Sequence, residues 1–233
     1  MTDPLLTEDE LLLKNTVREF ADQELAPRAA GYDGSGEFPW DNVRGLAELG
    51  LFGLTIDEKY GGSGGTTRQL AVAVEEIARG CAATSVIYIS HLSLCARFIQ
   101  MFGTEGQKQR FVPPLAGGER IGAFALSEAG SGSDAAALRT TATKADGHYV
   151  LNGSKLFISN AVEADTFVVL VTHDPSLRAG GIDALVVEKD ARGITVNPQH
   201  GKMGMRASST AEVVFQDCSV PQENRLGDEG DGF

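Results

Sequence analysis

The sequence has few cysteines, few basic residues and no recognisable targeting segment. Its three cysteines, Cys81, Cys95 and Cys218, are an odd number and form no CxxC pair, so we expect reduced and mostly buried thiols. The 20 Lys and Arg residues are outnumbered by 32 Asp and Glu residues, and the net charge of −12 argues against nucleic acid or an anionic membrane as a partner. The acidic N-terminus shows no leader pattern, and no apolar run approaches the roughly 20 residues that span a membrane. These absences predict a cytoplasmic protein.

The four histidines form no metal-binding pattern. His91, His148, His173 and His200 give neither an HExxH nor an HxH spacing, so we predict no metal site. His91 lies in an apolar segment of helical periodicity, where a buried, hydrogen-bonded histidine is expected rather than a catalytic one. Glycine, by contrast, is abundant. The 28 glycines among 233 residues are well above the usual glycine share of about 7%. They indicate special turns or backbone that lies close to a ligand.

The periodicity of the chain changes in the middle. From Thr7 to about Gly118 apolar residues recur at helical spacing, and two capping boxes, Thr7 with Glu10 and Thr104 with Gln107, indicate helix starts. We expect a helix from about Pro39 to Gly50 and expect Pro113-Pro114 to end the last helix. After Gly118 the period drops to two, which indicates strands. We expect these over residues 121–127, 141–145, 148–151, 155–159, 166–172, 182–188 and 211–215.

Two turn signals separate the first of these strands. Asp146-Gly147 is typical of a tight hairpin, and Asn152-Gly153 suggests a second turn before Lys155. Short strands without helices between them favour an antiparallel barrel or sandwich. The predicted fold class is therefore α+β, with an all-α domain over residues 1–119 and an antiparallel β-barrel or sandwich domain over residues 120–228.

Two glycine-rich segments match known motifs only formally. Gly130-Ser-Gly-Ser-Asp-Ala135 matches the dinucleotide fingerprint, but the next strand follows too soon for a βαβ unit. Its small residues could instead bind a phosphate with backbone amides, or form a solvated surface loop, and composition does not decide between the two. Gly61-Gly-Ser-Gly-Gly65 matches the nucleophile elbow of serine hydrolases. We expect a flexible loop there, and a hydrolase acting through Ser63 is a minor alternative.

Four longer motifs resemble the acyl-CoA dehydrogenase family. Residues 121–134, IGAFALSEAGSGSD, resemble a strand that leads into S/T-E-x-G-x-G-S-D, and residues 152–160, NGSKLFISN, resemble N-G-x-K-x-W/F-I-S/T-N. Residues 202–210, KMGMRASST, resemble K-x-G-x-R-x-S-x-T, and residues 220–227 resemble V-P-x-x-N-x-L-G. The motifs follow one another in order along nearly the whole chain.

The resemblance implies a flavoprotein of lipid metabolism that binds FAD. Ser127 matches the position whose hydroxyl contacts the flavin ring, and Phe157 matches the aromatic residue beside that ring, which is tryptophan in many members. Ser133 matches a position at both the pyrophosphate and the bound acyl-CoA, so it is also the implied substrate contact. The full set of implied cofactor contacts is Phe124, Leu126, Ser127, Gly132, Ser133, Phe157, Ile158 and Ser159.

The resemblance also implies a reaction and partners. Family members dehydrogenate an acyl-CoA thioester between its α and β carbons, usually pass the electrons to an electron-transfer flavoprotein, and form tetramers. They continue beyond the segment that matches Gly230–Phe233 into a second helical domain, which carries the glutamate base. Residues 229–233 are therefore expected to start such a domain, and we expect an inactive fragment without a catalytic residue. The open alternatives are an acyl-CoA oxidase or flavin monooxygenase of the same superfamily, and a non-catalytic flavin-binding module.

Overall fold

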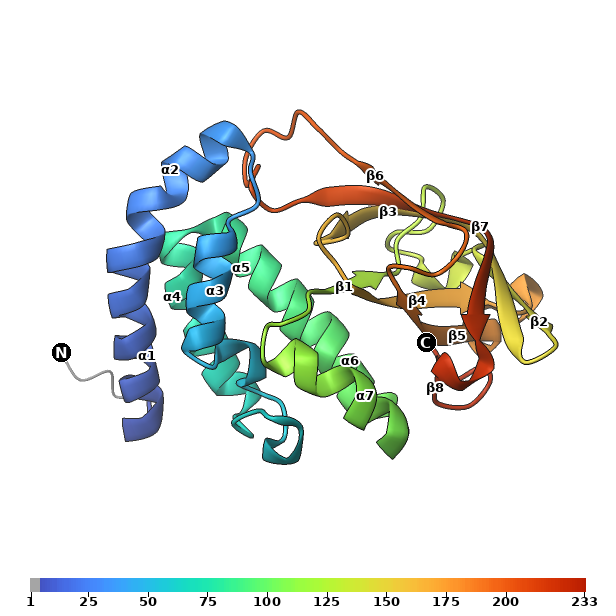
Figure 1. Ribbon diagram of the computed structural model, residues 1–233, viewed down its shortest axis with the longest axis horizontal. Coiled ribbons are helices and arrows are strands. Elements are labelled where there is room, and N and C mark those ends of the chain that lie inside the picture. Colours follow the sequence, from blue (N-terminus) through green and yellow to red (C-terminus); the bar gives the residue numbers. More distant parts are fainter. Residues whose placement is uncertain (1–4) are drawn as a thin grey trace.

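A computed structural model describes residues 5–233, and it contains a helical part followed by a sheet (Figure 1). The first four residues, on which part of the leader expectation rests, lie outside the described residues. Helix α1 (Glu8–Phe20), a π-helical turn (Ala21–Leu25) and α2 (Ala26–Ser35) follow one another without a break. Apart from short 3₁₀ turns, the helices that follow are α3 (Trp40–Glu48), α4 (Thr67–Gly80), α5 (Ala82–Ile89), a π-helical segment (Ser90–Ala96), α6 (Arg97–Phe102) and α7 (Glu105–Ala116).

Reciprocal side-chain and backbone hydrogen bonds start three of these helices. The capping boxes predicted at Thr7 and Thr104 are both present. A third capping box, Thr66 with Gln69, begins α4 and was not predicted. In each box the threonine hydroxyl and the carboxylate or amide three residues later satisfy amides that the first turn leaves unpaired. Local sequence chemistry therefore fixes where these helices begin.

The end of α7 differs from the prediction. Pro113 and Pro114 lie inside this helix and do not end it. The fixed φ of proline is compatible with a helix, and what each proline removes is one amide donor. The helix continues to Ala116, and the amide of Gly117 donates to the Pro113 carbonyl oxygen at 2.9 Å.

Eight strands form one sheet in the order β6-β7-β3-β2-β4-β5-β8, with β1 also paired to β4. Most pairs are antiparallel, but β4 runs parallel to β1 and at one position to β2, so the sheet is mixed. The α+β class is confirmed, while the domain boundaries at 119/120 and 228/229 stay predictions. The strands are β1 (Gly122–Ala125), β2 (Thr141–Ala145), β3 (His148–Ser159), β4 (Thr166–Thr172), β5 (Ile182–Glu188), β6 (Ile194–Pro198), β7 (Thr210–Pro221) and β8 (Arg225–Leu226).

The two predicted turns in this region have different outcomes. Asp146-Gly147 connects β2 to β3 as a hairpin, as predicted. Asn152-Gly153 makes no turn, because β3 continues through it with a shift of register against β7 between Leu151 and Gly153. Gly153 has a φ of 145°, and a Cβ there would lie 2.7 Å from Thr140 Cα. Glycine is needed at this irregularity for its backbone conformation and for close packing.

Strand β4 divides the hydrophobic core into two parts. All seven of its residues are buried. Val168 and Leu170 belong to the cluster that contains the helices, whereas Phe167, Val169 and Val171 belong to the cluster among the strands. Successive strand residues point to opposite faces, so a strand covered on both faces is apolar at every position. The helices thus pack directly on one face of the sheet.

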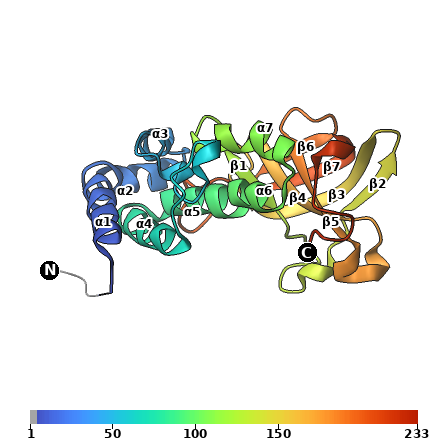
Figure 2. The same cartoon turned by 90° about the horizontal axis from the view of Figure 1, so that it is seen from below.

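The continuous helical stretch Ala82–Phe102 corrects one expectation. Its 21 residues are long and apolar enough to cross a membrane by length and composition alone, contrary to the expectation that no such run exists. In this fold 61% of the apolar window is buried inside the protein. The stretch runs through the middle of the molecule toward the sheet (Figure 2). Its apolar composition is that of a central core helix.

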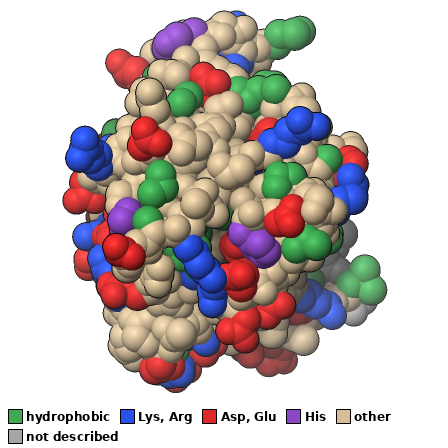
Figure 3. Space-filling model, turned by 90° about the vertical axis from the view of Figure 1, so that its right-hand side faces the viewer, with side chains coloured by type: hydrophobic (Ala, Val, Ile, Leu, Met, Phe, Trp, Pro, Cys, Tyr) green, Lys and Arg blue, Asp and Glu red, His purple; other side chains and the backbone are tan. Residues whose placement is uncertain are grey.

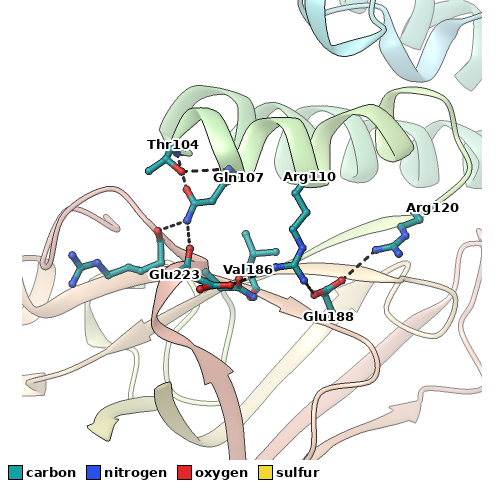
Figure 4. A network of polar contacts seen from close by, with 9 residues as sticks. Thr104, Gln107, Arg110, Arg120, Val186, Glu188 and Glu223 are labelled. Carbon is teal, nitrogen blue, oxygen red and sulfur yellow. Dashed lines mark hydrogen bonds and ion pairs between the residues drawn. The ribbon is translucent and has the colours of Figure 1, made fainter. Parts of the chain in front are cut away.

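Helix α7 is joined to the sheet by a polar network (Figure 4). The Gln107 side-chain amide, which also caps α7, donates to the backbone oxygens of Glu223 and Arg225 at 2.6 and 2.7 Å. Arg110 and Arg120 both form ion pairs with Glu188 at the end of β5. The helical part and the sheet are therefore connected by directed bonds as well as by apolar contacts.

The sheet end of the molecule, on the right of Figure 1, carries charged side chains of both signs. Seen from the right-hand side of Figure 1, positive and negative side chains are interspersed, with isolated hydrophobic side chains between them (Figure 3). No broad field of one sign covers this face of the described residues. The net negative charge of the chain is therefore not concentrated here.

Candidate functional site

The structure brings the first two motifs into direct contact. The first motif contains β1 and the loop after it, and the second covers the later part of β3. The backbone amide of Leu156 donates to the carbonyl oxygen of Ser127 at 2.8 Å. This bond places Ser127 next to the segment Phe157–Ser159. Two segments about thirty residues apart in the sequence thus form one local surface.

Phe157 projects outward from a bulge at the end of β3. The register of β3 against β7 shifts between Lys155 and Ile158, and Phe157 has a φ of 61°. Its side chain is 67% exposed, whereas Ile158 is buried in the strand core. A non-glycine residue in the left-handed region costs about 1–2 kcal/mol, and such strain clusters at functional sites. An exposed aromatic ring held at a strained position is suited to contact a flat ligand.

Asn160 holds the end of this strand in place. It also has a positive φ, 65°, and its side chain is fully buried. The side-chain amide donates to the carbonyl oxygens of Ile87 and Gly122 at 3.0 and 3.2 Å. One residue therefore ties the Phe157 bulge to both α5 and β1, and this cross-link supports the strained conformation.

A buried ion pair lies beneath Ser127. Lys155 is fully buried, and its ammonium lies 2.7 Å from Glu128 Oε1 and 3.0 Å from the Leu126 carbonyl oxygen. Burial lowers the pKa of Lys155, and Glu128 offsets part of this effect. Burial also acts to raise the pKa of Glu128, but hydrogen bonds from Lys155 and Thr140 outweigh it and hold that pKa below its ordinary value.

The loop after Ser127 has an open backbone. Ser131 is buried and its hydroxyl donates to the Asp134 carbonyl oxygen at 2.9 Å, which fixes the turn. A Cβ at Gly130 or Gly132 would meet no atom within 4 Å, and Ser133 is exposed. The buried Ser131 hydroxyl thus fixes the conformation of the loop, while the outer side of its backbone at Gly130 and Gly132 is not covered by other atoms. This arrangement fits either of the predicted alternatives, and the exposed small residues leave room for a phosphate group.

The predicted contact residues have different environments. Phe124 and Leu126 are partly buried against the helical core, and the Phe124 ring lies 5.6 Å from the Phe98 ring, centroid to centroid. Ser127 and Ser159 are partly exposed, whereas Gly132 and Phe157 are exposed. Ile158 points into the strand core and can contact a ligand only through its backbone. The described surface therefore offers Ser127, Gly132, Ser133, Phe157 and Ser159 for contact, and flavin binding by them stays a prediction.

His91 is a core histidine, as predicted. It is fully buried in the π-helical segment, its Nδ1 accepts from the Gly122 amide at 2.9 Å, and its Nε2 lies 3.0 Å from the Leu115 carbonyl oxygen. These partners require a neutral ring with the proton on Nε2. Burial lowers the pKa of His91 to about 4. The ring links α7 to the first residue of β1.

The segment around Ser63 is not the flexible loop that was expected. The amides of Ser63, Gly64 and Gly65 donate to the carbonyl oxygens of Gly53, Ile56 and Leu54 at 2.7–2.9 Å. A Cβ at Gly62 would lie 2.1 Å from the Ile56 carbonyl oxygen, so the glycines serve close backbone packing. Within residues 5–233 no histidine or carboxylate is hydrogen-bonded to Ser63, and nothing supports a hydrolase.

The three cysteine side chains are buried thiols. Cys81, Cys95 and Cys218 are free and buried, as predicted. Burial raises the pKa of Cys95 to about 12 and that of Cys218 to about 11, so these thiols are unreactive. The described part of the chain contains no group of three or more His, Cys, Asp or Glu side chains that could hold a metal ion.

Sequence reasoning missed one part of this site. Lys155 and Glu128 each belong to a motif, but their pairing was not predicted. Glu128 and Lys155 lie 27 positions apart, and only the pairing of β3 with the segment after β1 brings them together. A buried lysine inside a strand was the available signal, because a buried charge needs a partner.

Comparisons with known proteins identify relatives of the whole chain. The family model described as "Acyl-CoA dehydrogenase, N-terminal domain" matches residues 7–119. The family model described as "Acyl-CoA dehydrogenase, middle domain" matches residues 123–218. A short-chain specific acyl-CoA dehydrogenase of Clostridium acetobutylicum is 44% identical over 228 residues, which are 98% of this chain and 60% of the relative. The chain therefore spans about three fifths of the length of this relative.

Solved structures agree with the sequence comparison. The butyryl-CoA dehydrogenase of Megasphaera elsdenii superimposes with a TM-score of 0.94 at 40% identity, over 100% of this chain and 62% of that one. An acyl-CoA dehydrogenase of Bacillus anthracis, complexed with FAD, gives a TM-score of 0.89 at 35% identity, over 100% of this chain and 39% of that one. At these identities the likeness extends to family as well as fold.

Proposed function

Because the chain belongs to the acyl-CoA dehydrogenase family, we propose that residues 1–233 form one side of the site in which such an enzyme holds FAD and an acyl-CoA thioester. The observation that carries this proposal is the hydrogen bond from the Leu156 amide to the Ser127 oxygen, which joins the two flavin motifs. Beside this bond stands the exposed Phe157 ring. An aromatic side chain at that place can cover a flat ring system and keep water from it.

The residues of this surface fit FAD. The exposed amides and hydroxyls between Gly130 and Asp134 suit a pyrophosphate, since no side chain fills the space outside Gly130 and Gly132. Ser127 and Ser159 would offer hydroxyls to the flavin ring, and Phe157 would lie beside it. FAD, when bound, supplies the electron acceptor for the dehydrogenation. The protein contributes orientation and a surface shielded from water.

The substrate class and partners follow from the family. Ser133 is proposed to contact the acyl-CoA as well as the pyrophosphate. The Clostridium relative is described as short-chain specific and the Megasphaera relative as a butyryl-CoA dehydrogenase, which supports a short acyl chain for this protein too. An electron-transfer flavoprotein as electron acceptor and a homotetrameric assembly are proposed on the same basis. A cytoplasmic location is proposed from the acidic N-terminal sequence.

Residues 1–233 are proposed to contain no catalytic base. The best carboxylate in the motif, Glu128, has both oxygens engaged: Oε1 with Lys155 and the Thr140 amide, and Oε2 with the Arg139 amide. A base must lie within about 3 Å of the proton that it removes, and Glu128 is directed into the protein instead. An acyl-CoA oxidase would differ from a dehydrogenase in rapid reoxidation by dioxygen, and a flavin-binding module would bind FAD without turnover.

We expect the chain of residues 1–233 to dehydrogenate no acyl-CoA at an enzymatic rate. A positioned base can supply about 7–11 kcal/mol of the barrier through proximity. Glu128, the carboxylate next to Ser127, has both oxygens engaged and is not available for this role. The assay mixes the chain, FAD, a panel of short and medium acyl-CoAs and an artificial electron acceptor, and follows bleaching of the acceptor. Turnover near 1 s⁻¹, the lower end of typical enzymes, would place a base within these residues. Glu128→Gln would then identify or eliminate Glu128.

A further inference from the structure

Lys155 forms hydrogen bonds to the residues on both sides of Ser127. Lys155 Nζ is bonded to the residue before Ser127, through the Leu126 oxygen at 3.0 Å, and to the residue after it, through the Glu128 carboxylate at 2.7 Å. The neighbouring Leu156 amide holds the oxygen of Ser127 itself. Three consecutive residues of the first motif are therefore fixed by two consecutive residues of the second.

The same carboxylate closes the loop that follows. Glu128 Oε2 accepts from the Arg139 amide at 2.7 Å, and Oε1 accepts from the Thr140 amide at 2.9 Å. Residue 128 begins the small-residue loop and residues 139 and 140 end it, so one side chain joins the two ends. The backbone pair between Glu128 and Ser131 tightens the first turn of the loop.

Stability alone does not account for this arrangement. Lys155 has 0% and Glu128 has 10% of its side chain exposed, and taking both charges out of water costs several kcal/mol for each ion. Well-packed apolar residues at such a site are often as stabilising as the ion pair, or more so. Unlike apolar side chains, the pair forms directional hydrogen bonds. Each of these bonds holds a particular backbone atom, either beside Ser127 or at an end of the loop.

We infer that Glu128 and Lys155 are a positioning pair that holds Ser127 and the loop of residues 129–138 in the shape that receives the flavin. This inference rests on the proposed function. It assigns Glu128 a role in shaping the site and not in proton transfer. The pair acts through the backbone of Ser127 and the loop, and it needs no contact with FAD of its own.

The test uses the full chain and compares a site variant with a matched control. The double variant Glu128→Gln/Lys155→Met removes the pair and leaves no unpaired buried charge. The control is Glu76→Gln, because Glu76 is also a buried carboxylate, with 1% of its side chain exposed and ion pairs to Arg18 and Arg79 in the helical part. A single Lys155→Met variant, in which the Glu128 carboxylate keeps its bonds from the Arg139 and Thr140 amides, serves as a second site variant if the double variant does not fold.

The first readout needs no flavin. Hydrogen exchange detected by NMR reports the protection of the Leu156 amide, whose acceptor is the Ser127 oxygen. We expect exchange of this amide to be at least tenfold faster in the site variants than in the wild-type chain, and unchanged in Glu76→Gln. The second readout is FAD affinity by fluorescence titration, with an expected loss of at least tenfold in the site variants only.

Unchanged Leu156 protection in a folded site variant would overturn the inference, as would equal effects of the control. If the wild-type chain bound no FAD, the proposed function would fail, but the exchange experiment would still decide whether the pair positions Ser127. Failure of the proposed function and failure of the inference thus give different results.

Discussion

Between pH 6.5 and pH 4 the free energy of unfolding should fall by up to about 3 kcal/mol because of His91 alone. Burial lowers the pKa of this ring from 6.5 to about 4 in the folded chain. Below pH 6.5 the unfolded chain takes up a proton that the folded chain does not, so the unfolded state is favoured. Above pH 6.5 the ring is neutral in both states and does not lower the free energy of unfolding. As the pH falls toward 4, only the unfolded chain is protonated at this ring, and the free energy of unfolding decreases.

Burial of the ring is the main cause of the lowered pKa, and the hydrogen bond that Nδ1 accepts is a second reason for the ring to stay neutral. A second ring proton would sit on Nδ1, which faces the amide of Gly122 at 2.9 Å. Two donors would then oppose each other inside the core, at the residue where β1 begins. Acid should therefore weaken the link between the π-helical segment and the strand that leads to Ser127.

Urea unfolding at several pH values measures this contribution. The quantity of interest is the pH dependence of wild-type stability minus that of His91→Gln, since carboxylates common to both chains then cancel. His200→Gln, a change at an exposed histidine, controls for histidine substitution itself. Equal slopes for the wild type and His91→Gln between pH 4 and 6.5 would show that His91 does not remain neutral in the fold.

Gly62→Ala should destabilise the chain by about 3 kcal/mol, at the upper end of overpacking substitutions. The added methyl group would lie 2.1 Å from the Ile56 oxygen and 2.6 Å from the Gly53 oxygen. Both obstacles are backbone atoms, which cannot move aside as a flexible side chain can. The loop would have to release the hydrogen bonds that Ser63 and Gly64 make to the same two residues.

Gly106→Ala is the matched control for that substitution. Gly106 lies in the first turn of α7, and a Cβ there meets no atom within 4 Å. Alanine in a helix is favoured over glycine by about 0.5–1 kcal/mol, so this variant should gain stability. Thermal unfolding of both variants gives the comparison. A neutral effect of Gly62→Ala would mean that the segment is as flexible as its composition suggested.

These glycines illustrate what the sequence could and could not predict. The capping boxes at Thr7 and Thr104 and the Asp146-Gly147 hairpin depend on residues close in sequence, and all three are confirmed. The role of Gly62 depends on contacts with the segment Gly53–Ile56, which composition does not reveal. Asn152-Gly153 is a turn by local preference, but pairing of β3 with both β2 and β7 overrides it.

Strand β6 was missed for a related reason. Residues Ile194–Pro198 alternate apolar and polar side chains over only five positions and end in a proline, which makes the strand short and easy to overlook. Their pairing with β7 at the edge of the sheet defines the strand. Edge strands depend on a neighbour for their hydrogen bonds, and proline is tolerated there.

In the candidate site, too, the sequence predicted the residues but not the contacts between them. Motif resemblance supplied Ser127, Ser133 and Phe157 but not their spatial relation. The bond between Ser127 and Leu156 and the buried partner of Lys155 arise where the segment after β1 meets β3. The strained φ of Phe157 arises at the bulge of β3 against β7. The motifs along the chain were enough to predict which residues belong to the site, whereas the distances and contacts between them could be known only from the fold.

The central claim, that the segments around Ser127 and Phe157 form one side of a flavin site, is tested most directly by titrating FAD into the chain. Flavin fluorescence anisotropy should show weak, saturable binding. Phe157→Ala should weaken it at least tenfold, which corresponds to about 1.4 kcal/mol. Trp40→Ala, a change at a partly exposed aromatic residue of α3, should leave it unchanged. Absence of saturable binding, or equal affinities of the wild type and Phe157→Ala, would contradict the account.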